Sequence, residues 1–266
     1  MKILFACDLD NTLLHSYSHK KEGDICIEYK NGEEQGYVTK YVHDNFSSAI
    51  NGVDFVPATS RSILQTKRIS FFDKFAIYII ASNGGRLLVN GKEDNEWSKT
   101  TDTVFKTYKD EFDKLTKKAS EESELFKYAR IVDNTYFYLS VNDGFDVKSI
   151  FDNYQKNTTL VGLTNKKKIY FTPEQINKGH AVLKLKEKLG SDLVVAAGDS
   201  VLDLSMLNIA DIAIVPNEDF ASNIKAKTVY VNEHELNFCD FVVITLERIL
   251  EDYNLWKHSL EFCLFY

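Results

Sequence analysis

Hydrophobic and polar positions along the chain fall into two patterns. Short, nearly continuous apolar runs at residues 2–7, 53–58 and 193–197 are typical of strands that are buried on both faces of a parallel sheet. Amphipathic stretches near residues 42–50 and 181–189 are typical of helices that cover such a sheet. Elements of these two kinds pack in layers around one core. The pattern therefore predicts an α/β fold with a Rossmann-like parallel-sheet core.

The pattern changes in the middle of the chain, at residues 86–171. We expect a long polar helix, two paired strands, a second helix and two further strands, at residues 102–127, 129–132, 136–141, 147–156, 160–163 and 169–171. Antiparallel pairs beside helices are typical of an α+β domain. The sequence thus predicts a core of residues 1–85 and 172–266, interrupted by an inserted α+β domain of residues 86–171.

Shorter elements connect these parts. Residues 25–39 alternate apolar and polar positions around Asn31-Gly32, which is a strong hairpin signal. A helix near residues 62–72 and a strand at 75–80 are expected next. The crossings into and out of the inserted domain hold Gly84-Gly85 and Pro173. Because glycine tolerates large dihedral changes and proline does not, we expect the inserted domain to move as a body over the core.

The composition limits the partners and the location. The chain has 266 residues, 44% of them hydrophobic, a formal net charge of −7 and a pI near 5.5. A negative chain argues against nucleic acid as the main partner, since phosphate backbones select basic patches. No apolar stretch approaches the length that crosses a bilayer, and the four cysteines show no CxxC pairing. We expect a cytoplasmic protein that binds a small molecule; its oligomeric state is not indicated.

Pairs of acidic residues follow the first and the last of the three apolar runs. Asp8 and Asp10 come after the first run, and Asp199 and Asp203 after the last. Ligands of open α/β sheets gather at the carboxyl ends of the strands. Carboxylates that lie close together repel one another unless a cation lies beside them. These residues therefore predict a cation site at this edge of the sheet. The alternative is that they and their polar neighbours cap helices.

Four segments resemble, in order, the motifs of the haloacid dehalogenase-like hydrolases, which are mostly magnesium-dependent phosphatases. They are Asp8-Leu9-Asp10-Asn11-Thr12, Thr59-Ser60-Arg61, Asn177-Lys178-Gly179-His180 and Gly198-Asp199-Ser200-Val201-Leu202-Asp203. The resemblance covers nearly the whole chain, and an insertion at this place looks like the family's type-two cap domain. Asn83-Gly84-Gly85 resembles the sugar-phosphatase branch, often called Cof-type. Gln65, Arg68-Ile69, Tyr37-Val38-Thr39 and Trp97 add a resemblance to bacterial phosphatases found near tellurium-resistance genes.

The resemblance implies a role for each matching residue. Asp8 would be the nucleophile, and Asp10 would protonate the leaving group and then activate water. Thr59 and Lys178 would neutralise and orient the phosphoryl oxygens. Mg²⁺ would be held by Asp8, the backbone carbonyl of Asp10, and Asp199, with Asp203 acting directly or through water. The residues that would contact the substrate are Thr12, Ser60, Arg61, Asn83 and Gly84.

These roles predict a magnesium-dependent phosphatase that hydrolyses a small phosphorylated metabolite, such as a sugar or polyol phosphate, through an aspartyl-phosphate. Two alternatives remain. A phosphomutase of the phosphomannomutase type shares this motif order and cap type, and a non-catalytic phosphate-binding module could use the same fold. The complete set of motif residues counts against the last.

The cap sequence carries no motif that names the substrate. Lys166-Lys167-Lys168 is typical of a solvated turn between strands, with contact to a substrate anion as the alternative. The abundant Phe and Tyr residues lie mostly in apolar segments, and we interpret them as core.

Overall fold

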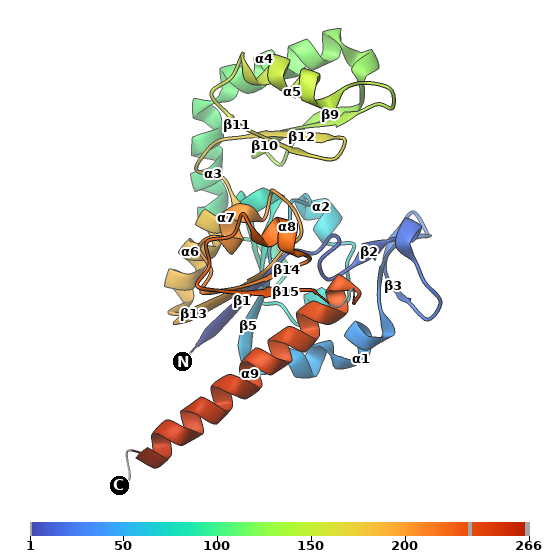
Figure 1. Cartoon of the computed structure of the whole chain (residues 1–266). Helices are drawn as coiled ribbons and strands as arrows, with labels where there is room; N and C mark the ends of the chain where they lie inside the picture. The colour runs from blue at the N-terminus through green and yellow to red at the C-terminus, as the bar shows by residue number, and fades with distance from the viewer. Residues whose placement is uncertain (1, 234–235, 264–266) are drawn as a thin grey trace.

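The computed structural model describes residues 2–233 and 236–263, with side chains described as far as residue 253 (Figure 1). Its centre is a five-stranded parallel sheet with the strand order β15-β14-β13-β1-β5. The bounds are β1 Ile3–Cys7, β5 Val53–Pro57, β13 Leu193–Ala197, β14 Ile212–Val215 and β15 Thr228–Val231. Every residue of β1 is buried, as expected for a central strand. The predicted α/β core with a parallel sheet is confirmed.

The register of this sheet aligns the ends of three neighbouring strands, β13, β1 and β5. Cys7, the last residue of β1, pairs with Pro57 of β5 on one side and with Ala197 of β13 on the other. The segments that follow these strands therefore leave the sheet at the same edge. This alignment brings sequence positions almost 200 residues apart to one place.

Helices cover both faces of the parallel sheet. On one face lie α1 (Lys40–Ala49) and α9 (Phe238–Cys263), which pack against each other and against the β1 side chain Phe5. The other face carries α6 (Lys178–Leu189), α7 (Leu204–Leu207) and α8 (Glu218–Ala221) (Figure 1). Here Leu4 of β1 packs with Val182 and Met206.

An antiparallel sheet of three strands lies beside the core. The β3–β4 hairpin (Ile25–Lys30 and Glu33–Val38) turns at Asn31-Gly32, and β2 (His15–Ser16) pairs with β4. Both turn residues have positive φ angles, 54° and 83°, as the Asn-Gly signal predicts. The hairpin prediction is confirmed.

A second small sheet consists of β6 (Tyr78–Ala81), β7 (Arg86–Val89) and β8 (Lys92–Glu93). The prediction of a helix at residues 62–72 is wrong in length, because α2 covers only Ile63–Thr66. Phe71 and Phe72 instead pack edge-on against each other and around Phe46 of α1, so the chain bends to bury them. The short 3₁₀ turns of the structure are Tyr17–His19, Phe72–Lys74, Ser82–Gly84 and Ser123–Leu125.

The inserted region contains a four-stranded antiparallel sheet with the order β11-β12-β10-β9. Its strands are β9 Phe126–Val132, β10 Tyr136–Val141, β11 Val161–Asn165 and β12 Lys168–Thr172. Helices α4 (Lys109–Glu121) and α5 (Val147–Gln155) cover the face of this sheet that points away from the core (Figure 1). We call this unit the cap.

The prediction of a single helix at residues 102–127 is also wrong. Two helices, α3 (Asn95–Thr107) and α4, meet at Tyr108, where the ring of Phe105 stacks on that of Phe112 at 4.7 Å. The start of α3 belongs to the core, since Trp97 packs with Leu87 and Leu4. The predicted domain bounds stay a prediction, and this packing argues for a crossing within α3 rather than at residue 86.

The cap also contacts the core through the turn between β9 and β10. The Asp133 carboxylate accepts hydrogen bonds from the Ile63 backbone N–H at 2.9 Å and from the Ser82 hydroxyl at 2.5 Å. The Asp133 carbonyl accepts two more from the Arg86 guanidinium. The turn is thus a third attachment of the cap, besides the two crossings of the chain.

Two further features concern the whole chain, its membrane-spanning potential and its cysteines. Among the described residues, none of the helices has the length and apolar character needed to span a membrane. Cys7, Cys26 and Cys239 are free thiols, and the side chain of Cys263 lies outside the described ones.

Candidate active site

The four motifs meet at the carboxyl edge of the parallel sheet. Asp8 directly follows β1, and its backbone N–H donates to the Ala197 carbonyl of β13 at 2.9 Å. On the other side, the Ala58 N–H donates to the Cys7 carbonyl at 2.8 Å. The strand pairing therefore continues by one residue past the ends of the strands and fixes the backbone from which the motif side chains project.

Lys178 is the most deeply buried cation of the site, with 1% of its surface exposed. Its Nζ lies 2.6 Å from Asp8 Oδ1 and 2.6 Å from Asp203 Oδ1. Burial alone would lower the pKa of Lys178, but the two carboxylates outweigh it and the pKa is raised. Lys178 is therefore a fixed positive charge between two acids.

Sequence-local features place Lys178 there. It is the first residue of α6, and the Asn177 side chain caps this helix by accepting from the His180 N–H. A Cβ atom on Gly179 would lie 2.3 Å from the Ser205 carbonyl oxygen. Only glycine lets the start of α6 approach α7 so closely.

Asp203 shapes the loop that follows β13. It is fully buried, and its Oδ2 accepts from the backbone N–H groups of Asp199 (3.2 Å) and Ser200 (2.9 Å). The Ser200 hydroxyl also donates to this oxygen at 2.8 Å. A Cβ on Gly198 would lie 2.5 Å from that of Asp203, so this loop needs glycine there. Both oxygens of Asp203 are thus engaged, one by Lys178 and one by the loop.

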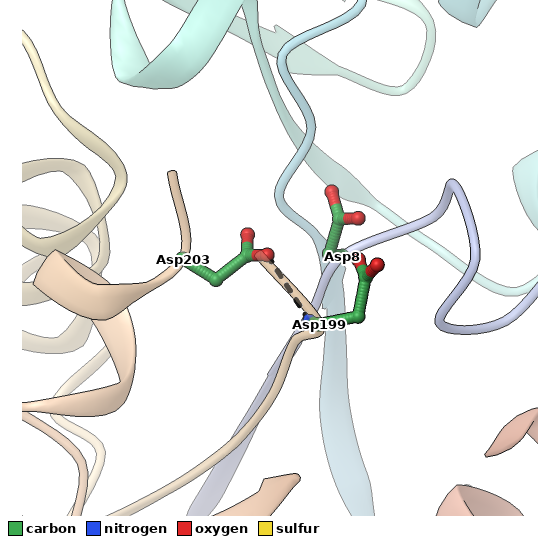
Figure 2. A group of neighbouring side chains, drawn as sticks. All are labelled: Asp8, Asp199 and Asp203. Atoms are coloured by element: carbon green, nitrogen blue, oxygen red, sulfur yellow. Dashed lines mark hydrogen bonds between the residues drawn. The ribbon is translucent and has the colours of Figure 1, made fainter. Parts of the chain in front are cut away.

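Asp8, Asp199 and Asp203 form a cluster of carboxylates. Each offers an oxygen within 4.8 Å of the others, and Figure 2 shows Asp8 beside the two residues of the loop. Burial, with the charge of Asp203, raises the pKa of Asp199 to about 7, and burial raises that of Asp8 well above its usual range. A set of hard oxygen donors that repel one another fits a divalent cation such as Mg²⁺. Asp199 is the freer ligand, since its carboxylate accepts only a long hydrogen bond, 3.4 Å, from the Thr12 hydroxyl among the described residues.

Asp10 does not point into this cluster but pairs with Arg61. The guanidinium donates twice, from Nε to Oδ2 and from Nη2 to Oδ1, at 2.7 Å each. Burial would raise the pKa of Asp10, but the hydrogen bonds and charge of Arg61 outweigh it and lower the pKa, with a contribution from Lys168 of the cap. The carboxylate that would act as general acid is therefore held ionised by Arg61.

Glu28 of the β3–β4 hairpin continues this chain of ion pairs, and sequence reasoning missed it. Only 2% of its surface is exposed, and its Oε1 lies 2.8 Å from Arg61 Nη1 and 3.0 Å from Arg68 Nε. The pairing of β3 with β4 shifts register on either side of Glu28, as in a β-bulge. Because a bulge interrupts the alternation of inward and outward positions, no pattern in the sequence marks Glu28 as buried.

The Glu28→Gln variant is expected to lower the free energy of unfolding by about 1–3 kcal/mol, because two partly buried guanidinium groups lose the charge of the buried carboxylate that they share. We also expect a lower kcat, since Arg61 is less well positioned beside Asp10. Urea denaturation and steady-state kinetics measure both effects. Glu33→Gln, on the exposed start of β4, is the matched control and should change neither.

The remaining predicted site residues, which are the substrate contacts and the catalytic Thr59, divide into two groups. Ser60 and Arg61 line the pocket described below. Thr12, Thr59, Asn83 and Gly84 are buried and do not line it. The Thr59 hydroxyl accepts from the Arg61 N–H at 3.1 Å, and the Gly84 carbonyl accepts from the Trp97 indole. Their role in binding stays a prediction, while their observed contacts support the loops around the site.

A pocket of about 760 Å³ opens above Asp8, between the core, the β3–β4 hairpin and the cap. Four tyrosines of the cap sheet line it: Tyr128, Tyr136, Tyr138 and Tyr170. The interpretation of the aromatic residues as core is wrong for the exposed Tyr128, while Tyr136 and Tyr170 belong to a small buried cluster, with Tyr138 packed against it, and line the pocket as well. The signal was present in Tyr136-Phe137-Tyr138-Leu139, where the tyrosines alternate with side chains that enter the cap's hydrophobic core.

Comparisons with known proteins agree with this geometry. The sequence matches the profile of a haloacid dehalogenase-like hydrolase family over residues 90–234, more than half of the chain. No curated protein matches it by sequence.

Among solved structures, the sucrose-phosphatase of Synechocystis, in complex with sucrose and phosphate, has a TM-score of 0.65 at 13% identity and covers 93% of this chain and 99% of its own. A haloacid dehalogenase-like hydrolase from B. subtilis has a TM-score of 0.58 at 18% identity, with the same coverage. A subclass IIB sugar phosphatase of the same superfamily has a TM-score of 0.58 at 13% identity, covering 96% and 99%.

The fold and the acidic site at its strand ends are those of a phosphoryl-transfer hydrolase with a cap. The chain belongs to the haloacid dehalogenase-like hydrolases. The predicted family is confirmed, and the matching folds include the sugar phosphatases of its Cof-type branch. The closer relationship to phosphatases near tellurium-resistance genes stays a prediction.

Proposed function

We propose that this protein is a magnesium-dependent phosphatase that hydrolyses a small phosphorylated metabolite through an aspartyl-phosphate at Asp8. The observation that carries the proposal is the buried Lys178, which holds one oxygen of Asp8 at 2.6 Å beside the carboxylate cluster, at the floor of the pocket. With Oδ1 engaged, Oδ2 of Asp8 is left to attack phosphorus. Sugar phosphatases with the same fold support a sugar or polyol phosphate as the substrate class.

The chain's own residues divide the work. Lys178 orients Asp8 and balances part of the negative charge that meets the phosphate. Asp199 would hold Mg²⁺ together with Asp8, and the metal would supply positive charge where the phosphoryl oxygens and Asp8 approach each other. Asp203, with both oxygens engaged, holds Lys178 and the loop rather than the metal itself.

Asp10 carries the proton in both half-reactions. It gives a proton to the leaving oxygen as the P–O bond breaks, and later takes one from the water that cleaves the aspartyl-phosphate. The bidentate Arg61 contact must therefore loosen before Asp10 can be protonated. The substrate phosphate is a competing partner for the guanidinium, and its arrival would free Asp10.

The proposal is tested by assaying phosphate release from a panel of sugar phosphates, nucleotides and phosphorylated acids. Release should depend on Mg²⁺, stop with a chelator, and return when Mg²⁺ is restored. It should also proceed without a sugar bisphosphate activator, which a phosphomutase would require. Calcium should inhibit, because its larger and looser coordination allows bidentate binding of Asp8 and withdraws the attacking oxygen. Equal rates with calcium and magnesium would contradict the mechanism.

The two loop carboxylates should respond differently in the same assay. Asp199→Ala should raise the magnesium concentration needed for half-maximal rate more than Asp203→Ala does, because Asp199 is the freer ligand. Asp203→Ala should mainly lower the thermal midpoint, since it removes four hydrogen bonds to Lys178 and the loop.

A further inference from the structure

We propose that the cap sheet carries a second anion-binding subsite, formed by Arg130, Lys168 and the hydroxyl of Tyr170. The substrate would then be a phosphate monoester whose leaving group bears another anionic group, either a carboxylate or a second phosphate. This inference rests on the proposed function and narrows its substrate class.

The register of the cap sheet places these three side chains on one face. Tyr138 of β10 pairs with Arg130 of β9 on one side and with Tyr170 of β12 on the other. The next row in the same direction joins Lys168 to Ser140 of β10. Because neighbours in a row and residues two apart on a strand share a face, Arg130, Tyr170 and Lys168 all point the same way. All three line the pocket above Asp8.

Arg130 and Lys168 also lie within reach of one anion. They are on the two strands that flank β10, so their backbones are about 10 Å apart across the sheet. Both side chains are long enough to meet above the ring of Tyr138 between them. The Arg130 guanidinium already lies 5.9 Å from that ring's centroid.

These two cations differ from those nearer Asp8 in that neither forms a direct ion pair with a carboxylate that the structure describes, although the charge of Lys168 helps to lower the pKa of Asp10. Lys178 is held by two carboxylates, and Arg61 and Arg68 share Glu28. No ion pair joins Arg130 or Lys168 to a described carboxylate, although the chain carries a net charge of −7. Their charge is thus free to meet an anion that enters the pocket.

Tyr170 provides an independent observation. Only 5% of the Tyr170 surface is exposed, and its hydroxyl, which makes no hydrogen bond to a described residue, opens onto the pocket that the residue lines. The neighbouring Tyr136, equally buried, donates to the Ser60 carbonyl at 2.6 Å. A hydroxyl that faces the pocket without a protein partner is free to donate to a ligand atom there. A carboxylate or phosphate oxygen accepts such a hydrogen bond.

The substrate thus has two ends. The phosphate that is cleaved lies at Asp8 and Lys178, and the second anion lies against the cap. A volume of about 760 Å³ accommodates a small metabolite that spans both. A neutral leaving group would leave Arg130, Lys168 and Tyr170 without partners, and would be a poorer substrate.

The test compares pairs of related phosphate esters in which one member carries an additional anionic group. The two pairs are glucose 6-phosphate with 6-phosphogluconate, and fructose 6-phosphate with fructose 1,6-bisphosphate. For each pair we expect the doubly anionic ester to have the higher kcat/KM. For at least one pair, Arg130→Gln and Lys168→Gln should each lower the ratio of the two kcat/KM values, doubly anionic ester over singly anionic ester, by about fivefold to tenfold. This is the effect of one charge-assisted contact in a partly open pocket. Tyr170→Phe should lower it by a smaller factor.

Lys166→Gln is the matched control. This lysine is two residues from Lys168 and, like it, exposed, but it does not line the pocket, so its loss should leave the ratios unchanged. If the wild-type ratios are near one, or if Lys166→Gln changes them as much as Lys168→Gln does, the subsite inference is wrong while the phosphatase proposal stands. If no ester of the panel releases phosphate, the phosphatase proposal fails.

A binding measurement tests the subsite without turnover. Calorimetric titration of the Asp8→Asn protein with the same four esters should give a tighter Kd for the doubly anionic member of at least one pair. Adding Arg130→Gln to this variant should remove that preference. A preference that persists in the double variant would overturn the assignment of Arg130.

Discussion

Asp8→Asn is expected to reduce phosphate release by about 10⁴-fold or more, because an amide oxygen is a poor nucleophile and a weaker ligand for magnesium. The fold should survive. Lys178 keeps its contact with Asp203, and the amide oxygen can still accept from Nζ. Burial already raises the pKa of Asp8, and three carboxylates repel one another there. The thermal midpoint without magnesium should therefore stay the same or rise.

Asp10→Asn is the comparison that separates attack from proton transfer. With an activated aryl phosphate, whose leaving group needs no proton, this variant should still form phosphoenzyme but hydrolyse it slowly. Rapid-quench trapping of the phosphoenzyme measures both steps. Asp8 would lose its assigned role if purified Asp8→Asn released phosphate at a rate within tenfold of the wild type. Equal losses for Asp10→Asn with activated and unactivated esters would remove Asp10 as the acid.

Lys178→Met should have the largest effect on stability. The substitution keeps the length of the side chain but leaves Asp8 and Asp203 buried without their shared cation. Removing one partner of a buried ion pair costs about 3–5 kcal/mol. Urea denaturation should show a loss of that size, and activity should be lost with it.

Magnesium provides a second readout for the same variant. A divalent cation bound near Asp8 would replace part of the missing positive charge, so saturating magnesium should raise the thermal midpoint of Lys178→Met more than that of the wild type. Lys188→Met is the control on the same helix, since Lys188 pairs with Asp94 at the surface. A wild-type-like stability for Lys178→Met would show that the buried triad does not hold the site together.

The motif residues could be predicted from the sequence because each follows a strand or begins a helix that its own neighbours specify. Once β1 and β13 are recognised as buried parallel strands, their ends must lie at one edge, and Asp8 and Asp199 come together without further information. The glycines at 179 and 198 mark the same places, since the backbone there leaves no room for a Cβ.

The walls of the pocket could not be predicted in the same way, because they depend on how separate elements meet. Glu28 is buried only because a bulge turns it toward Arg61, which lies more than 30 residues away. Tyr170 and Arg130 are on one surface only because β10 lies between their strands. The break at Tyr108 likewise depends on α3 joining the core while α4 covers the cap sheet.

The turn at Asp133 has a consequence for how this enzyme can diversify. Residues next to it, such as Tyr136 with its bond to Ser60, are tied to the core and are constrained by the fold itself. Arg130 and Lys168 lie in rows of the cap sheet further from the turn, toward its free end, and make no hydrogen bond to the core residues that the structure describes. Substitutions at that free end would change the substrate specificity and leave the catalytic residues in place. A library randomised there, with Asp133 and Tyr136 kept, should yield folded variants far more often than one randomised beside the turn.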